Sequence, residues 1–263
     1  MSQVPQASFN MASLLPPYQE ITLPSNGYFD GDIPAVLHVR GLTIKELKFI
    51  TANGKLNKKS FDSTLASCIQ ESLDLSKLLV EDYNYIVYMI RLFSNGGKST
   101  ATTRCSNLNC RQQYNFDYDI IECAVVDRAE VLVEKTKTVN LPRFKREHNL
   151  DVNIEVKRLT RSDIINVENT MRVQAELASR EKRPNSVFPL TEYLKAYVVS
   201  ITGFPVPIPK EQLLDVFSAE DSQLVTTAFD DVVFGVKGQA DSVCPHCGEN
   251  NKYDIPFTDA FFL

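Results

Sequence analysis

Apolar residues near the start of the chain fall into two short stretches. Residues 21–24 and 36–39 have the length of strands, and the turn residues at 25–27 follow the first of them. Thr43 and Glu46 then form the sequence of a capping box, in which the two side chains satisfy free backbone N–H groups at the start of a helix. This order predicts a pair of strands that leads directly into a helix.

Two further stretches have apolar residues at helical spacing. Residues 61–73 and 81–93 each place apolar side chains on one face of a helix, and the glycines at 96–97 are expected to end the second helix. A strand is then expected before Cys105, and another at 114–121. The pattern therefore predicts an α+β protein.

The chain repeats this order in its second half. The stretch from His38 to Leu47 resembles the stretch from Glu155 to Ile164 with an offset of 117 (155 − 38), and a later set of residues recurs with an offset of 139 (244 − 105). The later set is Glu81, Asp82, Gly96, Lys98, Cys105 and Tyr114, which recur as Glu220, Asp221, Gly235, Lys237, Cys244 and Tyr253. The second copy thus carries 22 more residues (139 − 117), and the polar stretch 178–185 is expected to hold part of them.

The repetition predicts an internal tandem duplication. Each half is expected to have a small strand pair, about three helices and a cysteine knuckle of the zinc-ribbon type. For the second half we predict strands at 139–142 and 152–156, a helix that opens at Thr160 with Asp163, and later helices at 190–201 and 219–234.

The predicted organisation follows from the two copies. It consists of an extended N-terminal arm at 1–20, a first repeat at 21–123, a linker at 124–137 and a second repeat at 138–263. The arm is either a floppy terminus or a segment that docks on a neighbouring subunit. The apolar tail at 257–263 either contacts a partner or packs on a strand of its own repeat.

Each repeat ends in a cysteine pair. Cys105 and Cys110 are separated by four residues, and Cys244 and Cys247 are separated by two. Zinc takes four ligands in a tetrahedron, and each tight turn presents two sulfur atoms. The two pairs together therefore predict one structural zinc site per chain that joins the two halves. The alternative is two buried or oxidised pairs without metal, and the spacing does not distinguish zinc from iron.

The other cysteines and the histidine of the knuckle are not expected to bind the metal. Cys68 lies on the apolar face of a predicted helix, which indicates a place in the core. Cys123 follows a predicted strand and has no cysteine close to it in the sequence. His246 lies inside the second pair, where its side chain is expected to point outward.

Composition and charge narrow the possible functions. The chain has 263 residues, with 28 Lys and Arg against 33 Asp and Glu, and its net charge of −5 argues against general binding to nucleic acid. The short basic cluster at 143–146 is predicted to be a solvated loop. Neither a secretory signal nor an apolar stretch of membrane-spanning length is present in the sequence, so we expect a reducing cytoplasm and no membrane partner.

The sequence contains no catalytic motif. Residues 97–100, Gly-Lys-Ser-Thr, have the tail of a phosphate-binding loop, but Leu92 occupies the place of its first glycine and a helix precedes it. The histidines are His38, His148 and His246, and none belongs to a nucleophile or metalloprotease motif. We therefore expect no enzymatic activity and no small-molecule substrate.

The order of motifs in the first repeat is similar to that of the baseplate hub and hub-assembly proteins of contractile-tailed, T-even-like phages. The residues that carry the resemblance are Leu23-Pro24-Ser25, Arg40-Gly41-Leu42-Thr43 with Glu46, Ser67-Cys68-Ile69, the helix from Tyr85 to Phe93 with its glycine stop, and the cysteine knuckle. The resemblance implies a structural or chaperone role in building a tail baseplate, with other baseplate or tail proteins as partners. It also implies a place in the host cytoplasm during assembly, with the chain either retained in the virion or released.

A zinc-ribbon protein that binds nucleic acid or takes part in transcription is the alternative. The acidic balance of the chain, and the lack of a basic and aromatic-rich surface around the cysteine pairs, argue against it. Salt-dependent binding to DNA or RNA at physiological ionic strength would favour it.

Overall fold

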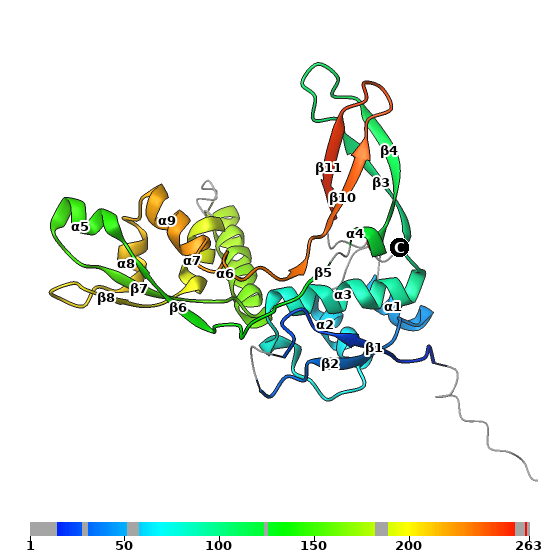
Figure 1. Cartoon of the computed structure of the whole chain (residues 1–263), viewed down its shortest axis with the longest axis horizontal. Helices are drawn as coiled ribbons and strands as arrows, with labels where there is room; N and C mark the ends of the chain where they lie inside the picture. The colour runs from blue at the N-terminus through cyan, green and yellow to red at the C-terminus, as the bar shows by residue number, and fades with distance from the viewer. Residues whose placement is uncertain are drawn as a thin grey trace, which may run out of the picture.

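The computed structural model describes residues 15–27, 31–51, 58–123, 126–181, 189–255 and 261, and it has a mixed α+β fold (Figure 1). The strands within these ranges pair in antiparallel fashion and form small sheets. The predicted α+β class is therefore confirmed. Residues 1–14 of the predicted arm and residues 257–260 and 262–263 of the predicted tail lie outside the described residues.

The first half is built around a long helix, α3. Strand β1 (Gln19–Thr22) pairs with β2 (Val36–Val39). The helices that follow are α1 (Ile44–Ile50), α2 (Lys58–Ser67), the short 3-10 helix η3 (Leu75–Lys77) and α3 (Val80–Asn95). As predicted, Thr43 caps the helix after the strand pair, and Gly96, with φ 74°, ends α3.

Helix α2 ends earlier than the predicted range of 61–73. After Ser67 the chain pairs with the end of β2, because the N–H of Arg40 donates to the carbonyl of Cys68 at 2.9 Å. The N–H of Gln70 likewise donates to the carbonyl of His38 at 2.9 Å. These bonds use backbone groups that further helical turns would need, so long-range pairing replaces the helix.

A buried arginine reinforces the capping box at Thr43. The Glu46 carboxylate accepts a hydrogen bond from the Thr43 N–H at 2.8 Å, and its two oxygens accept from the Arg40 guanidinium at 3.0 and 2.7 Å. Burial acts to raise the pKa of Glu46, but the hydrogen bonds from Arg40 and Thr43 outweigh it and lower the pKa to about 2.

Replacing Glu46 with glutamine is expected to lower the free energy of unfolding by about 2–3 kcal/mol at neutral pH. Because the pKa of Glu46 is lower in the folded protein than its usual 4.5, the carboxylate stabilises the fold fully above that pH and stops doing so as the pH falls toward about 2. The difference between wild type and variant should therefore shrink between neutral pH and about pH 3 in urea unfolding. Glu130→Gln, at an exposed glutamate, is the control and should change the stability by less than about 0.5 kcal/mol. A difference that stays constant with pH would contradict the assigned ion pair.

The second half contains a three-stranded sheet with helices packed against it. The sheet has the order β6 (Thr136–Asn140), β7 (Asn153–Lys157) and β8 (Val198–Thr202). The helices are α5 (Pro142–His148), α6 (Arg161–Arg180), α7 (Pro189–Tyr197), α8 (Lys210–Leu214) and α9 (Ala219–Thr226). Helix α6 opens at Thr160 as predicted and has 20 residues, against 7 in α1.

Two helices predicted in the second half are shorter than expected. The one predicted at 190–201 ends at Tyr197, because the β-branched residues of β8 pair with β7 instead. The one predicted at 219–234 ends at Thr226. Beyond this point the chain makes tighter turns, in which the N–H of Asp230 donates to the carbonyl of Thr227 and the N–H of Val232 donates to the carbonyl of Phe229, both at 3.1 Å. The carbonyl of Val232 accepts a hydrogen bond from the guanidinium of Arg158 at 2.9 Å.

The basic cluster at 143–146 lies in helix α5, and the prediction of a solvated loop is wrong. The Nε of Arg143 donates to the Asp221 carboxylate at 2.7 Å, and Asp221 is fully buried. An arginine that neutralises a buried carboxylate holds its own segment in place, which explains why this stretch is ordered as a helix.

The end of the chain returns to the first half. Strand β5 (Val126–Asp127) pairs with β9 (Gly235–Val236), and β10 (Gln239–Val243) forms a hairpin with β11 (Asn250–Asp254). Ala240 of β10 and Ile255 share the buried core of the first half, while the second half has a core of its own. A second hairpin, β3 (Lys98–Arg104) with β4 (Gln113–Asp119), precedes the short helix α4 (Ile120–Cys123) and lies beside β10–β11 (Figure 1).

Phe261, from the predicted tail, packs on helix α3. Its ring centroid lies 5.1 Å from that of Tyr88, its carbonyl accepts a hydrogen bond from Arg91, and only 3% of the residue is exposed. The described part of the tail therefore packs within this chain against α3, which offers both an aromatic ring and a buried donor, and it shares a core with Ala240 of β10.

Candidate metal centre

The four cysteines of the two predicted pairs come together at the tip of the two hairpins. Cys105 and Cys110 lie in the loop between β3 and β4, and Cys244 and Cys247 lie in the loop between β10 and β11. Figure 1 shows both loops at the same end of the paired hairpins. The four sulfur atoms all lie within 4.8 Å of one another. The structure thus groups the cysteines as the sequence predicts.

The distances between the sulfur atoms fit a tetrahedral metal site. The Sγ atoms of Cys105 and Cys247 are 3.6 Å apart, and those of Cys110 and Cys244 are 3.8 Å apart. A tetrahedron with zinc–sulfur bonds of about 2.3 Å has edges of about 3.8 Å. A disulfide would need about 2.05 Å, and all four cysteines are free thiols. The cluster is therefore suited to one metal ion, and four sulfur ligands suit zinc.

Each knuckle is shaped by a residue with a left-handed backbone directly after its second cysteine. Gly248 has φ 75°, and its N–H donates to the carbonyl of Cys244 at 2.9 Å. Arg111 follows Cys110 with φ 47°, and its N–H donates to the carbonyl of Asn107 at 3.0 Å. Glycine adopts this backbone without strain, so the second knuckle uses the residue type that its turn requires, whereas the first does not.

Backbone N–H groups favour a thiolate at Cys244. Burial acts to raise the pKa of Cys244, but the N–H groups of His246 and Cys247, with the neighbouring thiols, lower it to about 7. At Cys247 the N–H of Glu249 favours the thiolate, yet burial and the three other cysteines raise the pKa to about 12. The first thiolate in the cluster therefore hinders deprotonation of a second thiol, and a divalent cation would remove this repulsion.

Polar and aromatic contacts hold the two hairpins against each other below the cysteines. The Asn251 side chain accepts a hydrogen bond from the N–H of Ser106 at 2.7 Å, and the hydroxyls of Tyr114 and Ser242 lie 2.9 Å apart in a buried position. Phe116 of β4 packs edge-on against Tyr253 of β11, with 5.4 Å between ring centroids. The sequence singled out Tyr114 and Tyr253 as recurring residues, but it did not indicate Asn251 or Ser242, because a serine or asparagine carries no mark of its distant partner.

The remaining candidates lie away from the cluster. His246 is exposed and does not belong to it, and Cys68 is fully buried in the core of the first half, both as predicted. The side chain of Cys123 lies outside the described residues. Lys98 to Thr100 form the start of strand β3, directly after the glycines that end α3, so this segment is a strand and not a phosphate-binding loop.

Comparisons with protein-family models, with curated proteins and with solved structures give no match for this chain. Within the described ranges, none of the helices combines the length and the apolar character needed to cross a bilayer. The function is therefore inferred from the residues of this chain and their geometry.

Proposed function

We propose that this chain is a structural or assembly component of a contractile phage tail baseplate hub, and that it acts by binding other baseplate proteins. The motif order of the first repeat supports the baseplate assignment. The four-cysteine cluster is the observation that carries a structural rather than a catalytic role, because four protein ligands leave no coordination position for water or a substrate.

We further propose that the ion is one structural zinc per chain. Its ligands come from hairpins whose first cysteines are 139 residues apart (244 − 105), so the ion would fix the end of the chain to the first half. A structural zinc contributes its binding free energy directly to folding, since the ligands are brought together only in the folded state. A scaffold for other proteins gains rigidity from such a site without any reaction.

The chain is also proposed to have arisen by tandem duplication, and matching contacts in the two halves support this. Arg40 pairs with Glu46 at 2.7 Å, and Lys157 pairs with Asp163 at 2.6 Å. The partners in the second pair are displaced by the offset of 117 from those in the first (157 − 40 and 163 − 46). Each pair adjoins a capping box at the start of a helix.

Further contacts also recur at equivalent places. The N–H of Leu23 donates to the carbonyl of Ala35 at 2.8 Å, and the N–H of Leu141 donates to the carbonyl of Val152 at 2.9 Å. A buried aspartate also accepts a hydrogen bond in each half. The backbone N–H of Ser25 donates to Asp82 at 2.9 Å, and the Nε of Arg143 donates to Asp221 at 2.7 Å. The recurrence of similar contacts in the same order along both halves supports the proposed duplication.

Mass spectrometry of purified virions and of baseplate intermediates from infected cells tests the proposed function. We expect the chain to copurify with other hub proteins in the intermediates. Its presence in the virion as well would identify a structural component, and its presence in the intermediates alone would identify an assembly factor. Absence from both fractions, together with salt-dependent binding of the purified protein to DNA or RNA, would overturn the proposal.

A further inference from the structure

The two proposed repeats differ at a buried position next to helix α3 in the first half and next to the segment after helix α9 in the second. In the first half this position is Gly41, and a Cβ atom there would lie 2.4 Å from the carbonyl oxygen of Phe93 in α3. In the second half it is Arg158 (41 + 117), and its guanidinium donates at 2.9 Å to the carbonyl of Val232 (93 + 139). The second half thus holds an arginine where the first half has no room for a methyl group.

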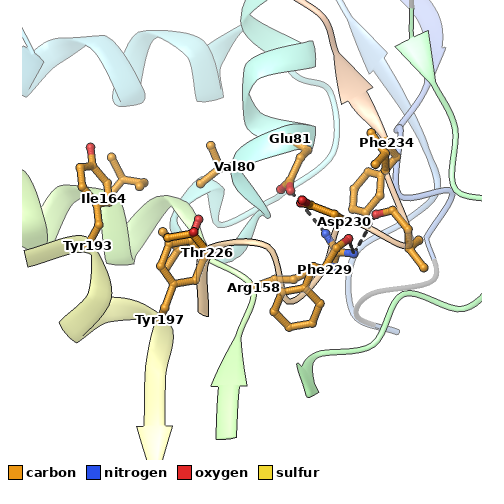
Figure 2. Close-up of a pocket in the computed structure, with 13 residues that line it drawn as sticks. Val80, Glu81, Arg158, Ile164, Tyr193, Tyr197, Thr226, Phe229, Asp230 and Phe234 are labelled. Carbon is orange, nitrogen blue, oxygen red and sulfur yellow. Dashed lines mark hydrogen bonds and ion pairs between the residues drawn. The ribbon is translucent and has the colours of Figure 1, made fainter. Parts of the chain in front are cut away.

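The two halves also differ in the length of the helix beside this position. Helix α3 runs to Asn95, whereas α9 ends at Thr226, before the equivalent position at Phe234 (95 + 139). The chain that follows α9 turns away, and a cavity of about 470 Å³ lies between it, the start of α3 and helices α6 and α7 (Figure 2). This volume lies within the range of sites that bind small molecules or single side chains.

The two ends of the cavity differ in chemistry. Figure 2 shows Ile164, Tyr193 and Tyr197 along one end, which is therefore aromatic and apolar. At the other end lie Glu81 and Asp230, next to Arg158. A ligand that spans the cavity therefore contacts aromatic rings at one end and carboxylates at the other.

The charge of Arg158 is already engaged within the protein. Its guanidinium lies 3.6 Å from the Glu81 carboxylate and is stacked between the rings of Phe229 and Phe234, at 4.6 and 4.9 Å from their centroids. Its Nε is buried and has no hydrogen-bond partner in the part of the chain that the structure describes. A buried donor without a partner is unfavourable.

The carboxylate of Asp230 is the charged group of the cavity that remains unused. Among the described residues it forms neither a hydrogen bond nor an ion pair, and it is exposed. Glu81 and Asp230 against Arg158 give the lining a net charge of −1. Aromatic rings and carboxylates in one cavity favour a cation carried on an apolar stem.

We propose that this cavity receives a lysine or arginine side chain of a protein partner. The stem of that side chain would lie along Val80, Leu159 and the rings of Tyr193 and Tyr197, and its charged end would reach Asp230. The inference deepens the proposed function and rests on it, because it assumes that the chain acts by binding another protein. It assigns the contact to the surroundings of Arg158, since Gly41 and Phe93 fill the equivalent place in the first half.

Nuclear magnetic resonance of methyl-labelled protein can test this with capped amino acids as probes. Capped lysine and capped arginine are expected to shift the methyl signals of Val80, Ile164 and Val232, with dissociation constants of about millimolar order. Capped norleucine, which has a similar stem without the charge, should bind at least about threefold more weakly. Asp230→Asn should weaken capped lysine to a similar extent, whereas Asp215→Asn, at an exposed aspartate outside the cavity, should not.

Three results would overturn the inference. Equal binding of norleucine would show an apolar cavity without charge selection, stronger binding of capped glutamate would show an anion site at Arg158, and unshifted methyl signals would show that no side chain enters. The titration uses only capped amino acids and needs no baseplate protein. A negative result therefore leaves the baseplate proposal standing, and absence of the chain from baseplate fractions would not change the outcome of the titration.

Discussion

Cys244→Ser is expected to abolish metal binding and to lower the melting temperature by more than about 10 °C, relative to a wild type that carries one zinc per chain. Cys244 is one of the four clustered ligands, and 1% of it is exposed. Without the ion, three thiols crowd the tip of the hairpins, and β10–β11 is held to β3–β4 only by contacts such as Tyr114 with Ser242. Elemental analysis measures the zinc content and calorimetry measures the melting temperature, in both cases with protein that has not been exposed to a chelator.

Two variants control for the loss of a cysteine and for a change in the knuckle. Cys68→Ala removes a buried thiol of the first core, and it should reduce stability while the zinc content stays at about one per chain. His246→Ala changes an exposed knuckle residue and should leave both zinc content and melting temperature close to wild type. A wild type with clearly less than about one zinc per chain, or Cys244→Ser protein that keeps its zinc, would contradict the metal site.

The clustering of the cysteines could be predicted from sequence because the information in a knuckle is local. Cys244, Cys247 and Gly248 lie within five residues, and together they specify two ligands and the turn that presents them. The partner pair at Cys105 and Cys110 could be assigned because the surrounding residues recur with one offset. The start of α1 was predictable for the same reason, since a capping box is complete within four residues.

Features that depend on distant contacts could not be predicted in this way. Helix α7 ends at Tyr197 because β8 pairs with β7, which precedes it by more than 40 residues in the register Glu155 to Ser200. The end of α9 and the cavity beside it depend on Arg158, which comes from another part of the chain. Apolar periodicity records which face of a segment is buried, and it does not record where a distant side chain takes over a backbone bond.

Gly41→Ala is expected to lower the free energy of unfolding by about 3 kcal/mol. The backbone of Gly41 is not in the left-handed region, so the effect would be steric. The new Cβ would lie 2.4 Å from the carbonyl oxygen of Phe93 and 2.9 Å from the nitrogen of Ser94, and neither backbone atom can rotate away. Moving the segment would also break the hydrogen bond of 2.7 Å from the Leu42 N–H to the Ser94 hydroxyl.

Gly31→Ala is the matched control, because a Cβ atom at Gly31 meets no atom of the described residues within 4 Å. Urea unfolding of both variants beside the wild type should show a change at Gly31 of less than about 1 kcal/mol. The comparison also bears on the difference between the halves. If Gly41→Ala unfolded like Gly31→Ala, the end of α3 would not lie closely against Gly41, and the first half would have room for a side chain there. The cavity beside Arg158 would then no longer be explained by the difference between Gly41 and Arg158, and the proposed site for a partner's basic side chain would lose the asymmetry on which it depends.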